Sequence, residues 1–481
     1  MRHYFLMHPI HSFDLYAQGK YYLKIFAFNF KSEHLYKMVY LFDFLYMLAI
    51  IAVSPVAIYR MIRHKRYRKG WANRLGNIHR KDPALRKCVW LHAVSVGEVN
   101  AAKTLITELK NKFPQFEIVL TTTTDTGFAR AKEVYSDSIR IFYFPFDFSW
   151  VMQKAFANIQ PTLCLLMELE VWPNFVHTAH QFKSPVVVVN GRISDRGFKR
   201  YNKINFLTRD TFRQVNLVLA QTEEYAHRFI QLGCRPEKVF VTGSLKYDTA
   251  QVADKVDGSD TLAEQLFGKI ENQKSKIKNR LWVAGATGND EEKIILDIYK
   301  KLKEQFTDLR LAIVPRKPER FDEVAQLITQ NGLPLIRYSK IKNAAVSETS
   351  SIINYQSSDS VILGDTMGDL RKFYSLADLI FVGRSLVPMG GSDMMEAAAL
   401  GKCTIFGPYA FNFQQTVDAL LADNGAIMVK TADELLQMIQ KCLSEPEFAR
   451  AIARSGQEII RKNQGATVRT IQHISKLLCG V

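Results

Sequence analysis

Along most of the chain, short continuous apolar runs alternate with amphipathic stretches. The first series of runs includes "CVWLHAV" from Cys88, "TLCLLMELE" from Thr162 and "VNLVLAQT" from Val215. These runs lack in-and-out alternation, which is typical of parallel strands buried on both faces. The stretches between them, such as "GEVNAAKTLITELKNKF", have helical periodicity. Alternating strands and helices predict an α/β domain with a doubly wound sheet.

The alternation lapses after residue 246 and resumes near residue 280. "TLAEQLFGKIENQKSKIKNR", from Thr261, is polar and charged, which is typical of a connection between domains. A second series of apolar runs then begins with "RLWVAGAT" and ends with "GAIMVK". Ligands of open α/β sheets bind beyond the carboxyl ends of the strands, so we expect the active site in a cleft between two domains. The predicted parts are an α/β domain at 61–250, a linker at 251–280, an α/β domain at 281–465 and a C-terminal helix at 466–481.

The N-terminal part has a different pattern. Met38–Tyr59 is apolar over 22 residues with one acid, Asp43, placed where it can reach a membrane interface. That length is about what a hydrocarbon core requires. Arg60–Arg74 follows with seven Lys and Arg residues, which predicts that this flank and the rest of the chain lie in the cytoplasm. We therefore predict a membrane-anchor helix at 38–60 after an extension at 1–37; the alternatives are a buried core helix and a helix lying in the interface.

The charge balance indicates an anionic partner. The formal net charge is +17, which suits anionic membrane lipid, a phosphorylated substrate or nucleic acid. Zinc-type spacings and RNA-binding signatures are absent, which disfavours nucleic acid, and no metal-binding cluster or P-loop is found. The six cysteines are scattered without a Cys-x-x-Cys pair, as expected of buried reduced thiols.

Three polar groups follow predicted strands of the first domain. Glu98 opens a helix after "LHAVSV", where a carboxylate is normally stabilised as the anion and can serve as a base; a plain capping acid is the alternative. Glu168 and Glu170 end an apolar strand, and alternation predicts that they share a face, as site residues or as a salt-bridged pair. Arg192 and Arg196 belong to a basic loop suited to an anionic acceptor, or to a solvated basic surface.

Further candidates lie at and beyond the domain boundary. Lys246, in "VTGSLKYD", can neutralise a phosphate or a leaving group, or be a surface lysine. Arg316 follows "AIVP" and can pair with a phosphate. The turn at Gly390–Gly391, before a helix that carries Glu396, offers backbone N–H groups to an anion.

Taken together, these segments resemble the family of 3-deoxy-D-manno-oct-2-ulosonic acid (Kdo) transferases of lipopolysaccharide synthesis. The resemblance covers about residues 38–475. The segments that carry it are "WLHAVSVGE", "TTTTDTG", "FPFD", "MELEVWPN", "NGRISDRGFKRY", "VTGSLKYD", "VPRKPERF", "LGDTMGDL" and "FGPYAFNF".

The resemblance implies a membrane-associated, inverting GT-B glycosyltransferase with two Rossmann-like domains. It implies transfer of Kdo from CMP-Kdo to a lipid A precursor (lipid IVA), with no metal or other cofactor. Glu98 matches the family's proton acceptor, and Glu168 and Lys246 match positions assigned to transition-state stabilisation. The segments that match CMP contacts are Pro315 and Arg316, then Met367, Gly368 and Asp369, and finally Asp393, Met394, Met395 and Glu396.

The chain departs from the family pattern at three places. Where the family usually reads Gly-Gly-His-Asn-Pro-Leu-Glu-Pro-Ala, this chain reads "GGSDMMEAA" from Gly390. Asp369 stands where the family more often has Glu, and Glu170 replaces a usual Thr. Two other functions stay open at this point: another membrane-associated GT-B enzyme of sugar nucleotides, such as an epimerase, and an inactive homologue that binds anionic lipid.

Overall fold

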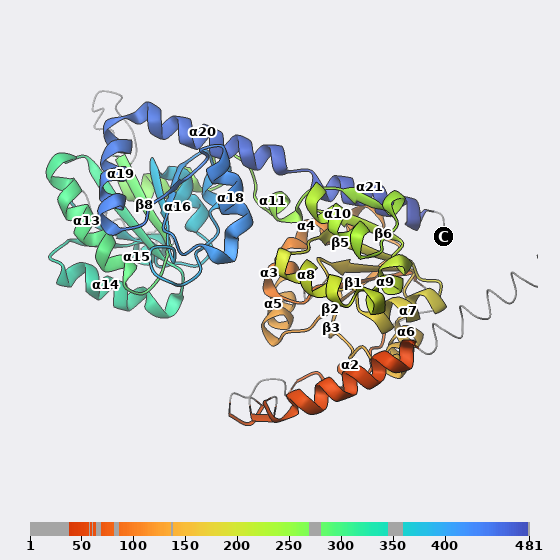
Figure 1. Cartoon of the computed structure of the whole chain (residues 1–481). Helices are drawn as coiled ribbons and strands as arrows, with labels where there is room; N and C mark the ends of the chain where they lie inside the picture. The colour runs from red at the N-terminus through yellow and green to blue at the C-terminus, as the bar shows by residue number, and fades with distance from the viewer. Residues whose placement is uncertain are drawn as a thin grey trace, which may run out of the picture. The chain divides into compact units, whose positions relative to one another are not determined.

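The structure is a computed structural model that describes residues 38–56, 58–59, 61–63, 69–80, 86–135, 138–268, 280–344 and 359–479. The chain folds into two compact units (Figure 1). The first contains the residues up to Leu245 together with those from Gly465 onward, and the second is Lys246–Gln464. The predicted extension at 1–37 lies outside the described residues.

The first unit is built on a seven-stranded parallel sheet with strand order β3-β2-β1-β4-β5-β6-β7. The order reverses between β1 and β4, which is the place where doubly wound sheets bind ligands. The central strands β1, β4, β5 and β6 are buried along their whole length, as the sequence pattern predicts. The strands are β1 (Cys88–His92), β2 (Glu117–Thr122), β3 (Arg140–Tyr143), β4 (Leu163–Met167), β5 (Val186–Gly191), β6 (Leu217–Ala220) and β7 (Val239–Val241).

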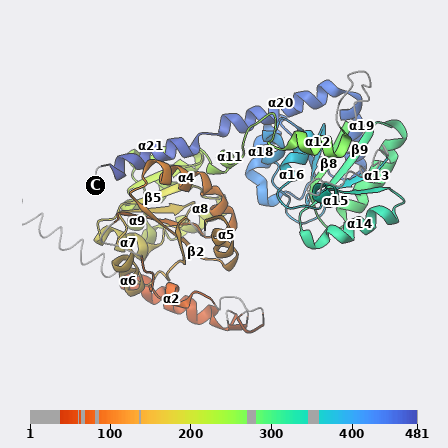
Figure 2. The same ribbon diagram turned by 180° about the vertical axis from the view of Figure 1, so that it is seen from behind.

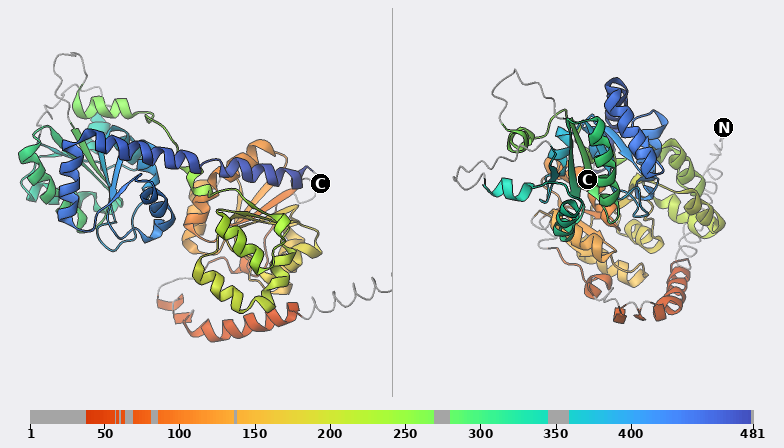
Figure 3. Two further views of the ribbon diagram at one scale, coloured as in Figure 1. Left: turned by 45° about the horizontal axis from the view of Figure 1, so that its top comes forward. Right: turned by 90° about the vertical axis from the view of Figure 1, so that its left-hand side faces the viewer.

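Helices cover both faces of this sheet (Figures 1 and 3). Val89 and Leu91 of β1 belong to one core cluster, and Cys88 and Trp90 to another, so both faces of the strand are buried. The helices are α2 (Trp71–Arg74), α3 (Val96–Ala101), α4 (Lys103–Lys112), α5 (Asp125–Tyr135), α6 (Ser149–Ile159), α7 (Pro173–Gln181), α8 (Asp195–Lys203), α9 (Asn205–Gln214), α10 (Glu223–Leu232) and α21 (Ala466–Leu478), with a 3-10 turn η1 (Pro236–Lys238).

The C-terminal helix α21 belongs to the core of the first unit. Its Ile471, Ile474 and Leu478 are buried in the cluster that also contains Leu105 and Leu109 of α4. Figures 1 and 2 both show α21 in blue beside α4. The apolar stripe of α21 therefore closes the first unit, although the whole second unit separates it from that unit in sequence.

The second unit has the same plan. Its seven-stranded parallel sheet has the order β10-β11-β9-β8-β12-β13-β14. The strands are β8 (Arg280–Thr287), β9 (Leu309–Pro315), β10 (Leu335–Arg337), β11 (Val361–Leu363), β12 (Leu379–Val382), β13 (Cys403–Phe406) and β14 (Ile427–Met428). The helices are α11 (Leu245–Thr249), α12 (Ser259–Phe267), α13 (Glu291–Gln305), α14 (Phe321–Gln330), α15 (Tyr338–Ala344), α16 (Leu370–Leu376), α17 (Met395–Ala399), α18 (Gln414–Ala422), α19 (Ala432–Ser444) and α20 (Pro446–Asn463), with 3-10 turns η2 (Pro318–Arg320) and η3 (Phe411–Phe413).

Part of the segment predicted as a linker, 251–280, is helical within the residues that the structure describes. Residues 259–267 form α12, and its Leu262 and Leu266 are buried in a core cluster of the second unit. These two leucines lie four residues apart and so share one helix face. The polar composition of the segment concealed this short apolar face.

The predicted anchor segment is helical. Within the described residues, Met38–Val56 is the helix long and apolar enough to cross a membrane, by length and composition alone. The Asp43 carboxylate accepts hydrogen bonds from the first unit, from Ser149 N–H at 2.9 Å, Ser149 Oγ at 2.5 Å and Asn174 Nδ2 at 2.9 Å. The helix (red in Figure 1) is thus docked on the first unit through its one acid. The sequence did not predict these partners, and the place of Asp43 relative to a membrane interface stays a prediction.

The cysteines agree with the predicted reduced thiols except at the C-terminus. All six are free, and five are buried, whereas Cys479 is exposed. Cys403 and Cys442 approach each other to 3.8 Å between their sulfur atoms.

Candidate active site

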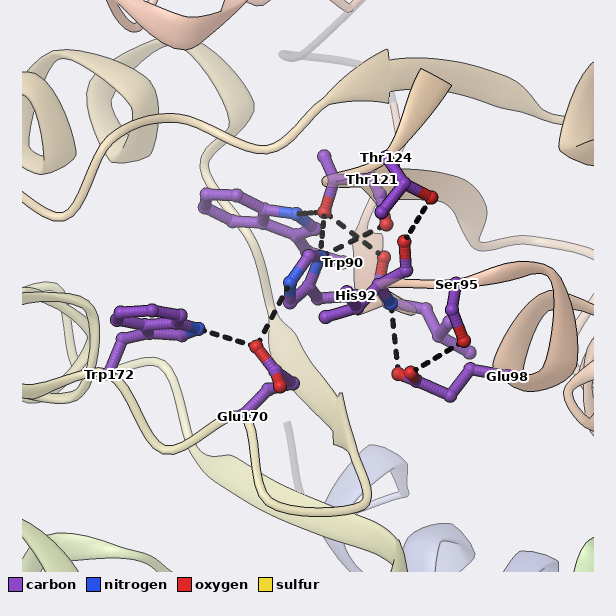
Figure 4. Close-up of polar contacts among 10 residues, drawn as sticks. Trp90, His92, Ser95, Glu98, Thr121, Thr124, Glu170 and Trp172 are labelled. Carbon is purple, nitrogen blue, oxygen red and sulfur yellow. Dashed lines mark hydrogen bonds and ion pairs between the residues drawn. The ribbon is translucent and has the colours of Figure 1, made fainter. Parts of the chain in front are cut away.

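Glu98 lies where the chain leaves β1 and enters α3. Its Oε2 accepts a hydrogen bond from Val94 N–H at 2.9 Å, and its Oε1 accepts one from the Ser95 hydroxyl at 3.0 Å (Figure 4). Ser95 is the N-cap residue of α3, so Glu98 occupies the third helical position, from which an acid reaches back to the start of its helix. The alternative of a capping acid is therefore correct, and it is compatible with a role as a base, because each carboxylate oxygen keeps a second lone pair.

The Glu98 carboxyl is easier to protonate than an ordinary glutamate. Burial is the largest influence and raises its pKa to about 7; Glu168 and Glu170 also raise the pKa, whereas hydrogen bonds from Val94 N–H and the Ser95 hydroxyl lower it. The hydrogen bonds at the start of the helix thus favour the anion, as expected, but the loss of water outweighs them. A pKa near 7 is well matched to a general base that works at neutral pH.

Glu168 and Glu170 lie beyond the end of β4 and not on it. The strand ends at Met167, and Glu168 adopts a left-handed backbone with a φ of 51°. Strand alternation therefore does not apply to this pair, and the prediction that it places both on one strand face is wrong. Both acids nevertheless lie close enough to Glu98 to raise its pKa. Three carboxyl groups thus gather at the carboxyl ends of β1 and β4, where the strand order reverses.

Glu170 is held by an aromatic residue and faces a histidine that the sequence reasoning missed. Trp172 Nε1 donates to Glu170 Oε2 at 2.8 Å, and the same oxygen lies 3.8 Å from His92 Nε2 (Figure 4). His92 Nδ1 lies 3.0 Å from the Thr121 carbonyl oxygen and 3.1 Å from the Thr121 hydroxyl. The imidazole ring stacks on Phe144 at 3.8 Å. One polar residue inside the otherwise apolar "CVWLHAV" was the available signal.

The predicted basic loop is a helix. Ser194 caps α8 by accepting a hydrogen bond from Gly197 N–H, and no residue of α8 is buried. Arg196 is exposed in its first turn, and Arg192 is half-buried just after β5. Arg196 thus lies on a solvent-exposed helix, and a contact of Arg192 and Arg196 with an anionic acceptor stays a prediction.

In the second unit, charged groups gather around Asp393. Burial raises the pKa of the Asp393 carboxyl, and Lys246 and Arg316 counteract that rise. Burial likewise raises the pKa of Glu396, and Asp393 adds to the effect while Arg371 and Arg316 oppose it. Four of the predicted residues, Lys246, Arg316, Asp393 and Glu396, therefore share one electrostatic neighbourhood near the end of β9.

The glycine turn is stabilised by hydrogen bonds and close contacts within the second unit. Gly390 and Gly391 have φ values of 90° and 82°, and a Cβ on Gly390 would lie 2.0 Å from Asn412 Nδ2. Gly391 N–H donates to the Arg384 carbonyl at 2.7 Å, and Met395 N–H donates to Asp393 Oδ1 at 2.9 Å. The turn and the helix start were predicted to offer their N–H groups to an anion. That prediction is wrong for Gly391 N–H and Met395 N–H, because both already donate hydrogen bonds within the protein.

Two of the predicted CMP-contacting side chains are core residues. Met394 and Met395 are buried in a core cluster of the second unit. Pro315 is also buried, at the last position of β9. These three can face a ligand through their backbone and not through their side chains.

The segment from Met367 to Asp369 forms an exposed loop with a fixed base. Met367 is 64% exposed, and Gly368 has a φ of 87°. Burial would raise the pKa of Asp369, but hydrogen bonds from Lys342, Thr366 and Lys372 outweigh it and lower the pKa to about 2. The Asp369 carboxylate thus accepts hydrogen bonds that fix the base of the loop. Among the described residues, no group of three or more His, Cys, Asp or Glu could hold a metal ion.

Two solved structures define the class of fold. A glycosyltransferase from Rickettsia africae ESF-5 matches with a TM-score of 0.50 and 14% identity, covering 82% of this chain and 99% of its own. A UDP-GlcNAc 2-epimerase from Neisseria meningitidis matches with a TM-score of 0.51 and 14% identity, covering 81% and 100%. Together with the two doubly wound units, these matches show a GT-B fold, as the sequence predicts. Because a transferase and an epimerase both match, the fold alone does not choose between them.

Sequence similarity makes that choice. A family model described as "3-Deoxy-D-manno-octulosonic-acid transferase (kdotransferase)" matches residues 69–249. A Haemophilus influenzae protein named 3-deoxy-D-manno-octulosonic acid transferase is 33% identical over 87% of this chain and 93% of its own length. The chain belongs to this family of transferases, which confirms the resemblance, and it is an enzyme of the glycosyltransferase class.

Proposed function

We propose that the protein transfers Kdo, with inversion, from CMP-Kdo to a lipid A precursor, with Glu98 as the general base. The observation that carries the proposal is the Glu98 carboxyl, half-buried at the switch point of the first sheet with a pKa raised to about 7. A relative over nearly the whole chain bears the name of that transferase.

The acceptor chemistry follows from the geometry of Glu98. Val94 N–H and the Ser95 hydroxyl fix the carboxylate, and its remaining lone pairs can accept the proton of an acceptor hydroxyl. The hydroxyl oxygen then bonds to the anomeric carbon of the sugar on the face opposite the departing CMP. Positive charge develops at that carbon, and a carboxylate such as Glu168 stabilises it.

Residues of the second unit would bind the CMP-Kdo donor and stabilise the departing CMP. The breaking bond leaves its electron pair on the CMP phosphate, and Lys246 and Arg316 supply cations for that charge. Asp393 and Glu396 can accept hydrogen bonds from sugar hydroxyl groups of the nucleotide. CMP carries one phosphate, so the reaction does not need a metal to bridge a diphosphate.

We further propose that the helix at 38–60 anchors the protein to the inner membrane with the catalytic units on the cytoplasmic face. The support is the apolar length of Met38–Val56 and the basic segment that follows it. A net charge of +17 favours both anionic lipid and a phosphorylated acceptor, with Arg192 and Arg196 as acceptor contacts.

The test is transfer by the full-length protein in detergent. CMP-Kdo and a tetraacylated, bisphosphorylated glucosamine disaccharide are supplied, and product mass is measured. Wild type should add Kdo, and Glu98→Gln should lose roughly 10²–10⁴-fold in kcat while still binding CMP-Kdo. Turnover of UDP-sugars in place of CMP-Kdo would favour the other sugar-nucleotide enzymes, and lipid binding without any turnover would favour an inactive homologue.

A further inference from the structure

The first unit contains a cavity of about 640 Å³ between the N-terminal helix and the loops beyond the sheet. That volume lies within the ordinary range for pockets that enclose a small ligand. The cavity is lined by Tyr46, Ala49, Ile50, Val53, Ser54, Val56, Ile58, Met61, Trp71, Arg74, Thr123, Phe144, Pro145, Phe146, Asp147, Phe148 and Trp172.

One face of the helix forms the roof. Tyr46, Ala49, Ile50 and Val53 are spaced by three and four residues, so they make a single stripe along the helix. The stripe is held in place at its start, where Asp43 binds Ser149 and Asn174 and the Tyr46 hydroxyl donates to Asp147 Oδ2 at 3.0 Å. The roof is therefore tied to the first unit by hydrogen bonds between side chains and does not depend on apolar contact alone.

The lining is apolar, and its charged members are already engaged. Asp147 accepts hydrogen bonds from Tyr46, from Asn174 N–H and from Phe175 N–H. Arg74 donates to the Thr123 carbonyl at 2.9 Å and lies over the Tyr143 ring. A ligand here meets mainly hydrocarbon and aromatic surface, which favours an apolar chain over a polar molecule.

Two residues of the cavity wall also support the candidate active site. Phe144 stacks on His92, and Trp172 donates to Glu170, which lies close enough to Glu98 to raise its pKa. The cavity thus borders the carboxylates on the side of the N-terminal helix. The outer residues of that helix are exposed and apolar, among them Phe44, Leu48 and Ile51, so a hydrocarbon surface adjoins the roof.

We propose that this cavity holds a fatty-acyl chain of the lipid acceptor while the acceptor's sugar lies at Glu98. The identity of the acceptor rests on the proposed function, whereas the preference for a hydrocarbon chain rests on the cavity itself. Seating one chain beside the carboxylates would bring the headgroup of a membrane lipid to the reacting site at a fixed distance from the helix. Acylation then becomes a determinant of acceptor affinity.

The first test fills the cavity. Ala49→Trp projects an indole from the roof, and Ile51→Trp makes a comparable change on the same helix at a position that does not line the cavity. Full-length variants are assayed with the acylated acceptor and with the same bisphosphorylated disaccharide after complete deacylation. Ala49→Trp should raise KM for the acylated acceptor by about tenfold or more and leave KM for the deacylated one unchanged, as loss of a buried chain requires. Equal changes for both acceptors, or the same change in Ile51→Trp, would overturn the proposal.

The second test does not depend on turnover. An acceptor with a photoreactive diazirine in one acyl chain is crosslinked to wild type, and the labelled peptides are identified by mass spectrometry. Crosslinks should form at residues 49–53 and 144–148, and an excess of unlabelled acceptor should suppress them. They should also be lost in Ala49→Trp and in Val53→Phe, which is a smaller increase in side-chain volume. Labels elsewhere, or competition by phospholipid and not by acceptor, would refute the assignment. If the protein is labelled at these residues but transfers no Kdo, the proposed function is contradicted and the acyl-chain site is still supported.

Discussion

At the scale of single residues, the carboxyl group of Glu98 is governed by two opposing effects. Two hydrogen bonds favour its anion, and burial beside two other acids favours its neutral form. The second effect prevails, so Glu98 is largely protonated below pH 7 and becomes competent as a base only as the pH rises through that value. The same arrangement that buries the base also makes its activity depend on pH near neutrality.

This balance predicts a pH profile and its shift in a variant. The kcat/KM of wild type should rise with pH through about 7 and then level off. Glu170→Gln keeps an acceptor for Trp172 but removes one negative charge that raises the pKa of Glu98, so the rise should move to lower pH. The measurement is the pH dependence of kcat/KM for both proteins. A profile that stays in place, or moves to higher pH, would show that Glu170 does not act on the base.

At the scale of elements, the N-terminal helix is joined to the first unit by a half-buried acid, Asp43. Asp43 accepts hydrogen bonds from three donor atoms of two residues at the start of α6 and α7. An acid in an apolar helix is costly unless its oxygens are paired, so this pairing both permits Asp43 and fixes the helix against the sheet. The helix therefore has a structural contact with the catalytic unit in addition to its proposed place at the membrane.

Removal of that acid should release the helix. Asp43→Ala removes the acceptor of the Ser149 N–H and hydroxyl and one of the two acceptors of Asn174 Nδ2, and it should weaken docking by about 1–3 kcal/mol. Hydrogen exchange of the full-length protein in detergent should then speed up in 38–56 and in the first turns of α6 and α7. Ser54→Ala is the control, because among the described residues the Ser54 hydroxyl hydrogen-bonds only to the Ile51 carbonyl of its own helix. Unchanged exchange in Asp43→Ala would mean that apolar contacts alone hold the helix.

At the scale of the whole molecule, the two units differ in how the chain builds them. The second unit is one continuous segment, whereas the first is completed by α21, which follows the entire second unit. Burial of Ile471, Ile474 and Leu478 is worth about 1.5–3 kcal/mol for each side chain, which is a large share of a domain's stability.

Dissection of the chain should expose this difference. A fragment of residues 246–464 should fold alone and bind CMP, since it contains Lys246, Arg316, Asp393 and Glu396. A fragment that ends at residue 245 should be unfolded or much less stable, and a peptide of residues 465–481 added in trans should restore it. Thermal unfolding with and without the peptide gives the readout. If the N-terminal fragment alone unfolds cooperatively at the same temperature as the full-length protein, α21 is not needed to stabilise the first unit.

Several errors of the sequence reasoning share one cause. Alternation could not place Glu168 and Glu170, because the turn after Met167 is set by packing and not by composition. The turn at Gly390–Gly391 was predicted to offer its N–H groups to an anion. The Arg384 carbonyl, earlier in the sequence, already accepts the hydrogen bond from Gly391 N–H, and the Asp393 carboxylate accepts the one from Met395 N–H. His92 was passed over because a lone histidine in an apolar strand shows its partners only when Thr121, Phe144 and Glu170 are brought around it.

The sequence by itself determined the two series of parallel strands, the apolar N-terminal helix, the placing of Glu98 at a strand-to-helix turn, and the family. These follow from periodicity and local order, which act over a few residues. Only the tertiary structure decided that Glu98 has a pKa near 7, that Asp43 docks the helix, that α21 completes the first unit and that a cavity opens beside the carboxylates. Burial and long-range hydrogen bonds depend on which distant segments meet, and that is settled by the packing of the folded chain.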